Sequence, residues 1–184
     1  MAILKIAQLG HRILRLIAQK VPPKIIKSLE VQILIDDMID TMREYEGVGL
    51  AATQVHESLQ IAVMEIPAAN SRYPGEKSVP VTVFINPIIT HLTEKKMEVW
   101  EGCLSVTGIR GAVSRPSKIR LQAYDRKGKE IDSIYEGFPA VAIQHETDHL
   151  FGKVFLDRMT DMTRIAFVAE YKKYHLGDKP DLEA

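Results

Sequence analysis

Several common features are scarce in this chain of 184 residues. It contains a single cysteine, Cys103, which excludes an intrachain disulfide and favours a reducing compartment. No apolar run approaches the ~20 residues that a membrane-spanning helix needs. The 24 basic and 24 acidic residues give a formal net charge of zero. We therefore expect no direct binding of nucleic acid or membrane.

Acidic residues are also absent from the first part of the chain, up to Glu30. A basic amino-terminal stretch without acidic residues is typical of an organellar transit peptide. The alternative is that residues 3–15 already belong to the fold, and the family resemblance described below favours this alternative.

The length and the ordinary content of 46% hydrophobic and 26% charged residues suit one globular domain. We expect a single α+β domain over residues 1–184, with residues 176–184 as a flexible tail. Mostly antiparallel sheets should surround a central helix, with one helix before them and one after them. No internal repeat is present.

The residue pattern predicts these elements in order. Residues 1–27 read as extended and irregular. Apolar residues then recur at three- to four-residue spacing from Ser28, a suitable helix cap, to Gly47, which predicts the first helix. Strands are expected at 59–66, 81–89, 97–100, 119–124 and 131–135, the last two as a hairpin.

Three further segments connect or follow these strands. Residues 67–80 read as a long surface loop. The segment that contains Gly108, Gly111 and Pro116 reads as a series of turns. A last amphipathic helix is expected at about 163–174.

The central helix carries the sequence QHETDH over residues 144–149. Residues four apart lie on one face of a helix, so the imidazoles of His145 and His149 can bind one ion, with Glu146 beside them. The pattern His-Glu-x-x-His is typical of zinc hydrolases. A surface helix is the alternative, but the apolar run 138–143 before the motif favours a buried helix, where polar residues need a partner or a metal.

Two histidines leave a catalytic metal site incomplete, since three protein ligands and one open position are usual. The thiolate of Cys103 is a strong candidate for the third ligand. Two alternatives stay open from the residues alone: a small buried hydrophobic residue, and a nucleophile with a histidine base.

The segment 47–54 reads GVGLAATQ. Its small residues allow another backbone or a ligand to come close. A nucleotide-binding glycine loop is a weaker alternative, because no long helix follows and the Lys-Ser or Lys-Thr pair is missing.

Three segments together resemble the signature motifs of the peptide deformylase family: GVGLAATQ at 47–54, EGCLS at 101–105 and QHETDH at 144–149. They stand in that family's order and at similar spacing, and residues 6–15 resemble its opening. The resemblance implies hydrolysis of the formyl group from the N-formylmethionine of newly made bacterial or organellar polypeptides. The bacterial cytoplasm is the expected location, with an organelle as the alternative.

The resemblance also implies the roles of individual residues. One divalent metal would be held by Cys103, His145 and His149, with ferrous iron as the native ion and zinc, nickel or cobalt able to replace it. Glu146 would be the general base and then the general acid. The Gln54 side chain and the Leu104 backbone N–H would stabilise the negatively charged intermediate.

The same resemblance implies how substrate is bound. The residues implied in binding the methionyl peptide are Val48, Gly49, Arg110, Phe138, Val141 and Ala142. Packing within the core or on the surface is the alternative for each. We expect Glu101 to anchor its loop through Arg110 or another basic residue, and His11, His56, His91 and His175 to be solvated.

The chain departs from the family pattern beside the matched positions. Thr53, His56, Thr107 and Phe151 replace residues that are frequent there: proline, glycine, proline and asparagine respectively. We expect these changes to affect loop shape and substrate preference more than chemistry.

The expected partners are N-formyl-methionyl peptides, with transient ribosome association and a monomeric state. Two other functions stay open: a metallopeptidase with a downstream third ligand, and a non-catalytic metal-stabilised binding domain, which would need a fourth protein ligand. A catalytically inactive paralogue is disfavoured, since every matched catalytic residue is present.

Overall fold

The structure is a computed structural model that describes residues 2–67 and 78–176. Its helices are α1 (Leu29–Glu44), α2 (Phe138–Leu150) and α3 (Val168–Tyr174). Its strands are β1 (Gly49–Ala51), β2 (Ile61–Ile66), β3 (Val79–His91), β4 (Lys96–Cys103), β5 (Val106–Pro116), β6 (Lys118–Tyr124), β7 (Glu130–Glu136) and β8 (Ile165–Phe167). The predicted loop at 67–80 and tail at 176–184 fall mostly outside the described residues.

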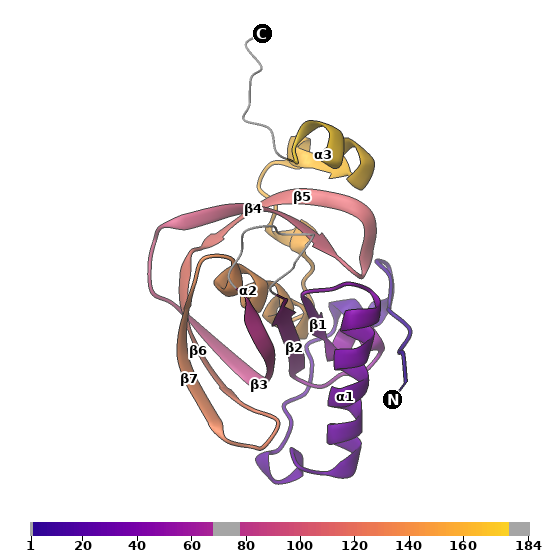
Figure 1. Cartoon of the computed structure of the whole chain (residues 1–184), viewed down its shortest axis with the longest axis vertical. Helices are drawn as coiled ribbons and strands as arrows, with labels where there is room; N and C mark the ends of the chain where they lie inside the picture. The colour runs from indigo at the N-terminus through magenta and orange to yellow at the C-terminus, as the bar shows by residue number, and fades with distance from the viewer. Residues whose placement is uncertain (1, 68–77, 177–184) are drawn as a thin grey trace.

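Two antiparallel sheets lie on either side of α2 (Figure 1). The larger sheet has the order β1-β2-β3-β6-β7, and the smaller has the order β4-β5-β8. Helix α2 contacts strands of both sheets. The predicted α+β fold with antiparallel sheets around a central helix is confirmed, as is the hairpin of β6 and β7.

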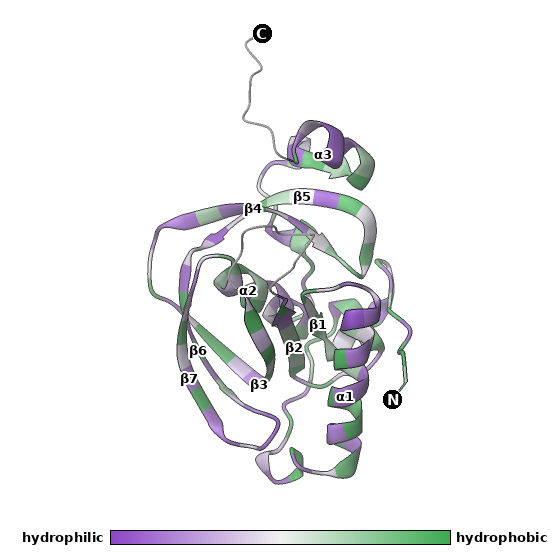
Figure 2. Ribbon diagram, viewed as in Figure 1, coloured by the Kyte–Doolittle hydropathy of each residue, from purple (hydrophilic) through white to green (hydrophobic). Residues whose placement is uncertain are grey.

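Helix α1 covers one side of the larger sheet. Its start is capped by Ser28, whose Oγ accepts a hydrogen bond from the Val31 N–H at 3.4 Å. Ile35 and Met38 of the apolar stripe are fully buried, and they belong to one cluster with residues of β1 and β2. Figure 2 shows hydrophobic and hydrophilic residues alternating along α1. The 3.6-residue period in the sequence thus corresponds to the buried face of the helix.

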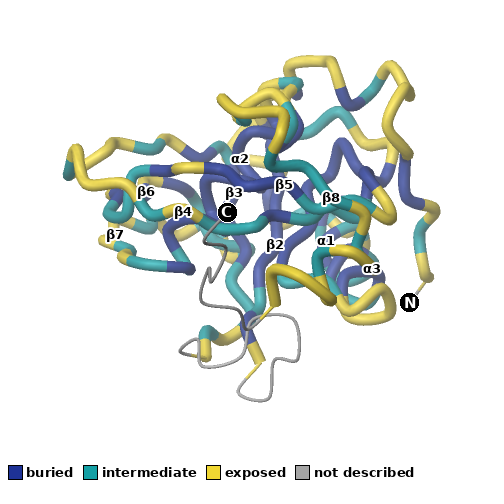
Figure 3. Tube along the Cα trace, turned by 90° about the horizontal axis from the view of Figure 1, so that it is seen from above, coloured by how far each residue is buried: buried dark blue, intermediate teal, exposed yellow. Residues whose placement is uncertain are grey.

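Helix α2 is buried along almost its entire length (Figure 3). Pro139 lies in its first turn, where a missing N–H costs nothing. After the helix ends, Gly152 adopts a φ of +70°, and a Cβ at this position would lie 2.7 Å from the Arg15 carbonyl oxygen. The glycine therefore lets the chain turn away against the amino-terminal segment.

The prediction of turns around Gly108 and Gly111 was largely wrong, because β5 runs through both residues and pairs with β4. Gly111 lies opposite Glu101 in the register. A Cβ on Gly111 would lie 2.9 Å from the Phe155 ring. The glycine thus permits close packing within a strand rather than a turn.

The last predicted helix was too long. Residues 162–164 form a 3₁₀ turn and residues 165–167 form β8, so that α3 begins only at Val168. The backbone of β8 pairs with β5 at positions such as Ile109 with Phe167. Pairing at this sheet edge prevails over the amphipathic pattern of the segment.

Candidate metal centre

The two helical histidines and the single cysteine meet between the sheets. His145 and His149 lie one turn apart on α2, and Cys103 ends β4. One potential ligand atom from each residue falls within 4.8 Å of the other two. The Cys103 Sγ lies 3.3 Å from the His149 Nε2. The structure therefore brings together the three residues predicted as ligands.

The electrostatic surroundings favour the thiolate form of Cys103. Burial disfavours the charged form, but the neighbouring His149 and His145 outweigh this effect and lower the pKa of the thiol from 9.0 to about 5. The thiolate is the form of cysteine that binds metal ions.

His145 is held by a buried network of charged side chains. Its Nδ1 lies 2.7 Å from Glu101 Oε2. Glu101 accepts two further hydrogen bonds from Arg115, at 2.5 and 3.0 Å. Arg115 also donates to Asp148 at 2.8 Å, and Arg158 donates to the same carboxylate. This network fixes the imidazole so that its Nε2 is left for the metal position.

The network also sets two pKa values. Burial disfavours the charge on Glu101, but His145 and Arg115 outweigh burial and lower the pKa of its carboxyl. Burial likewise disfavours the imidazolium of His145, but Cys103 and Glu101 raise its pKa well above 6.5. In the absence of a metal, the charges of this group therefore stabilise one another.

The expectation that Glu101 is anchored by Arg110 or another basic residue is confirmed, with Arg115 as the partner. The Arg110 Nη1 instead donates to the Trp100 carbonyl at 3.1 Å. The Arg115 network was not predicted, because no spacing rule relates residues 101, 115 and 148. A clue was the acidic pair formed by Glu146 and Asp148 in one buried helix, since one of these charges needs a basic partner.

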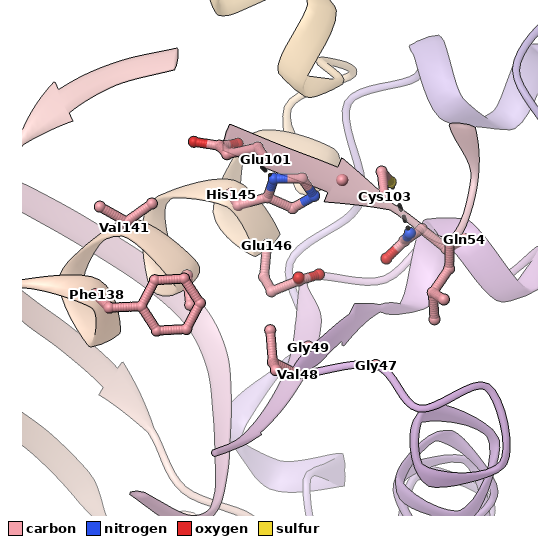
Figure 4. Close-up of a pocket in the computed structure, with 13 residues that line it drawn as sticks. Gly47, Val48, Gly49, Gln54, Glu101, Cys103, Phe138, Val141, His145 and Glu146 are labelled. Atoms are coloured by element: carbon pink, nitrogen blue, oxygen red, sulfur yellow. Dashed lines mark hydrogen bonds and ion pairs between the residues drawn. The ribbon is translucent and has the colours of Figure 1, made fainter. Parts of the chain in front are cut away.

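Glu146 is only 4% exposed, and among the described residues its Oε2 has no hydrogen-bond partner. Burial raises the pKa of this carboxyl from 4.5 to about 7. Its side chain lies against Gly49, where a Cβ would come within 2.6 Å of the Glu146 Cδ. The glycine therefore gives the carboxylate room beside the metal site (Figure 4).

Gln54 lies on the 3₁₀ turn after β1, with its side chain fixed at both ends. Its Oε1 accepts a hydrogen bond from the Ala51 N–H at 2.8 Å. Its Nε2 lies 3.2 Å from the Ser105 Oγ and 3.4 Å from the Cys103 Sγ. The amide donor is thus held beside the thiol, and Leu104 follows the thiol directly in the chain.

A cavity opens beside these groups (Figure 4). It is lined by all predicted site residues except His149 and Arg110: Val48, Gly49, Gln54, Cys103, Leu104, Phe138, Val141, Ala142, His145 and Glu146. The apolar part comes from Val48 and from the first two turns of α2. Arg110 lines a second cavity next to this one.

Three of the residues that differ from the family pattern, Thr53, His56 and Phe151, have distinct environments in the structure. The Thr53 hydroxyl donates to the His149 carbonyl at 3.2 Å. His56 has a φ of +70°, a conformation that glycine adopts without strain. Phe151 is 43% exposed at the end of α2. Of these residues, Thr53 thus supports the backbone of a predicted metal ligand, whereas Phe151 lines a separate cavity.

The remaining histidines, His11, His56, His91 and His175, are exposed, as the sequence predicts. His11 and His56 contact each other edge to face, with ring centroids 4.7 Å apart. His175 stacks on Trp100 at 4.6 Å. Among the described residues, the Cys103, His145 and His149 group is the one cluster of this kind with metal-binding geometry.

The donor set fits one divalent metal ion. A thiolate and two imidazoles suit zinc and ferrous iron. The His145 Nδ1 is occupied by Glu101, which supports the ligand from behind. Three protein donors leave a coordination position for water or substrate, as catalytic sites require.

Comparison with known proteins identifies the same family that the sequence motifs resemble. A family model described as polypeptide deformylase matches residues 3–165. The chain belongs to the polypeptide deformylase family. It is 44% identical over 159 residues to a peptide deformylase of Leptospira biflexa, covering 86% of this chain and 89% of that protein. It is 42% identical over 163 residues to peptide deformylase 2 of Pseudomonas syringae pv. tomato, covering 89% and 90%.

Solved deformylase structures are also similar. A class I type b peptide deformylase from Acinetobacter baumannii, with Met-Ala-Ser bound, superposes with a TM-score of 0.82 at 36% identity, covering 86% of this chain and 99% of that one. A peptide deformylase from Legionella pneumophila gives a TM-score of 0.75 at 38% identity, covering 89% of each chain.

Membership in the deformylase family decides between the functions that the sequence left open. The chain is a metallohydrolase that removes the N-formyl group from nascent peptides, and the metallopeptidase and binding-domain alternatives are not supported. None of the helices in residues 2–67 and 78–176 is long and apolar enough to span a membrane.

Proposed function

We propose that this deformylase reaction is carried out by Glu146 beside one divalent ion held by Cys103, His145 and His149. The observation that carries this proposal is the convergence of a thiol and two imidazoles beside a buried carboxylate. Ferrous iron is the proposed native ion, with zinc, nickel or cobalt as replacements, because each accepts thiolate and imidazole ligands. When bound, the ion would act as a Lewis acid, lowering the pKa of water and polarising the formyl carbonyl.

Glu146 transfers the proton in this proposal. A carboxyl with a pKa of about 7 can accept a proton near neutral pH and release it again. Its carboxylate takes a proton from water as the water oxygen bonds to the formyl carbon. It then gives this proton to the departing amine as the C–N bond breaks, which yields formate and a free amino terminus.

Gln54 and Leu104 stabilise the negative charge that develops on the formyl oxygen. The Gln54 amide is suited to this role because the Ala51 N–H fixes its oxygen and leaves its Nε2 turned toward Cys103. The backbone N–H of Leu104 is the second proposed donor. Loss of one such donor typically lowers the rate by about 10²–10³-fold.

The methionine side chain occupies the apolar part of the cavity. Val48, Phe138, Val141 and Ala142 form its proposed wall, and all four line the cavity. Gly49 lets the substrate backbone approach, as well as giving room to Glu146. Arg110 contacts the peptide beyond methionine, in the adjoining cavity. The Met-Ala-Ser peptide bound to the Acinetobacter baumannii relative supports such a substrate.

We further propose that residues 1–184 act as one catalytic domain and as a monomer in the bacterial cytoplasm. The packing of α2 against both sheets supports a single domain. The substrate arises on the ribosome, so transient ribosome association follows from the proposed substrate.

The experiment that tests the function uses protein purified without oxygen. Amine release from formyl-Met-Ala-Ser is measured together with the metal content of the same sample. Rapid release with about one equivalent of iron per chain, as one site of three ligands implies, would support the proposal. Full occupancy without release, also after exchange into nickel, would contradict it.

A further inference from the structure

The cavity at the metal centre continues into a second cavity of about 580 Å³. Gly102, Cys103 and Leu104 line both cavities. The second cavity lies between β5 and α3, and its lining includes residues of both elements. A peptide that leaves the first cavity past Leu104 therefore enters a space with α3 as one wall.

Helix α3 is held firmly over the smaller sheet (Figure 1). The Trp100 ring contacts the rings of Tyr171 and His175, with centroids 5.2 and 4.6 Å apart. The preceding strand β8 pairs with β5. These contacts fix the helix as a defined wall of the second cavity.

Tyr171 also contacts Arg110, a proposed substrate contact. The guanidinium carbon lies 5.5 Å from the centroid of the Tyr171 ring, within the range of a cation–π interaction. The Trp100 carbonyl accepts a hydrogen bond from the same guanidinium at 3.1 Å. The carboxy-terminal helix thus positions the arginine in the second cavity, next to Gly102, which lines both cavities.

The charges around this cavity are unequal. Among the described residues that line it, Arg110 of β5 and Lys172 of α3 carry positive charges and Glu46 carries a negative one. The remaining lining is mostly apolar, from residues such as Ile109 and Val168. This combination suits a peptide that carries an acidic side chain.

We propose that α3 forms a substrate-binding wall for the residues that follow methionine, with Lys172 and the Tyr171-positioned Arg110 selecting acidic side chains there. This inference rests on the proposed function, because it assigns part of the same peptide substrate. The family match ends at residue 165, before α3 begins. The proposed selection combines Arg110 of β5, which lies within that match, with Lys172 of α3, which lies beyond it.

The test compares two substrates of the metal-loaded full chain, formyl-Met-Ala-Asp-Asp and formyl-Met-Ala-Lys-Lys, at low salt. We expect a higher kcat/KM for the acidic peptide. Lys172→Glu should reduce the ratio of the two values about fivefold, the upper range for an exposed ion pair. The effect should fade at 1 M salt, where the Debye length falls to about 3 Å.

Lys173→Glu is the matched control, since it makes the same charge change one position along α3. Lys173 lies over the Tyr174 ring and is not part of the cavity lining. The Lys173→Glu variant should leave the ratio of the two kcat/KM values unchanged. Equal effects of the two variants, or no effect of Lys172→Glu, would overturn the proposal.

Tyr171 gives a second, independent readout. Tyr171→Ala should raise KM for the acidic peptide with little change in kcat, because it releases Arg110 without touching the reacting atoms. Tyr171→Phe should restore KM, since the ring remains. A KM that does not respond to Tyr171→Ala would contradict the positioning role, whereas absence of turnover by the unmodified chain would remove the proposed function itself.

Discussion

At the residue scale, the site keeps a buried carboxyl in a place where its charge is poorly stabilised. Glu146 is 4% exposed, and burial raises its pKa to about 7. In unfolded chains the same carboxyl has its ordinary pKa of 4.5. The folded state therefore binds this proton more tightly than the unfolded chain does. The protonated Glu146 carboxyl contributes stability to the folded state below pH 4.5, and this contribution is lost as the pH rises through 7.

This difference predicts a pH-dependent effect of Glu146→Gln on the metal-free protein. At pH 8 the variant should melt at a higher temperature than the unmodified chain, by about 2–4 °C for each kcal/mol gained. At pH 5 the two should differ much less. Calorimetry at both pH values measures this, with Glu136→Gln, at a side chain 69% exposed, as control. A stabilisation of the same size at both pH values would contradict the assigned pKa.

Cys103→Ser separates a metal ligand from a nucleophile. A hydroxyl is a much weaker ligand than a thiolate, so the variant should lose metal affinity as well as activity. Metal content after dialysis against a weak chelator is the measurement. A fully metallated but inactive variant would assign Cys103 to nucleophilic catalysis instead.

Several site residues could be predicted from the sequence because their signals are local. His145, Glu146 and His149 lie within one helical turn, and their relation follows from helix geometry alone. Cys103 was a candidate ligand as the single cysteine, but the choice of this residue, and the role of Gln54, depended on a resemblance of separate motifs. The Arg115 and Asp148 contacts depend on how α2 lies against β4 and β5, which no local pattern specifies.

At the scale of elements, the bond between Glu101 and Arg115 joins the two strands of the β4–β5 hairpin beneath α2. Both side chains are nearly inaccessible, at 4% and 5% exposure. Breaking such a buried pair typically costs about 3–5 kcal/mol, because an uncompensated charge remains. The same carboxylate also supports His145.

Glu101→Gln should therefore lower both the melting temperature and the metal affinity. Loss of a group that supports a metal ligand typically weakens affinity about 10–100-fold. Asp132→Asn is the control, because it breaks an ion pair with Arg120 in which both side chains are 48% exposed. This control should change stability by less than about 1 kcal/mol and leave metal affinity unchanged. Equal effects of the two variants on the metal would exclude the supporting role of Glu101.

Strand prediction failed where glycine has a packing role. Gly111 resembles a turn residue in the sequence, but in β5 it gives room to Phe155 and Met159. Residues 165–167 fit an amphipathic helix equally well, and only the open edge of β5 makes them a strand. Both outcomes depend on neighbours that are distant in the sequence.

At the scale of the whole molecule, the metal site links the two sheets. Cys103 comes from the smaller sheet, whereas the histidines come from α2, which packs against the larger one. The strand order β1-β2-β3-β6-β7 could not be predicted, since it skips β4 and β5 and requires pairing of β3 with β6. The fold class could be predicted, because it follows from the number and type of elements.

Removal of the metal should therefore lower the folding stability of the whole molecule. An ion that binds only the folded state stabilises it by RT ln(1 + [L]/Kd), about 4 kcal/mol at a thousandfold excess over Kd. Chelation should lower the melting temperature of the unmodified chain by several degrees. The Cys103→Ser variant should respond much less under the same conditions. No response of the unmodified chain would argue against a metal that links the sheets.

The most direct test of the central claim is the turnover of formyl-Met-Ala-Ser by Glu146→Gln, measured with its metal content. If Cys103, His145 and His149 hold the ion and Glu146 transfers the proton, the variant should keep about one metal per chain, as in the unmodified protein. Its turnover should fall by at least about 10²–10⁴-fold. A fully metallated variant with substantial residual turnover would contradict the role of Glu146 and the mechanism built on it.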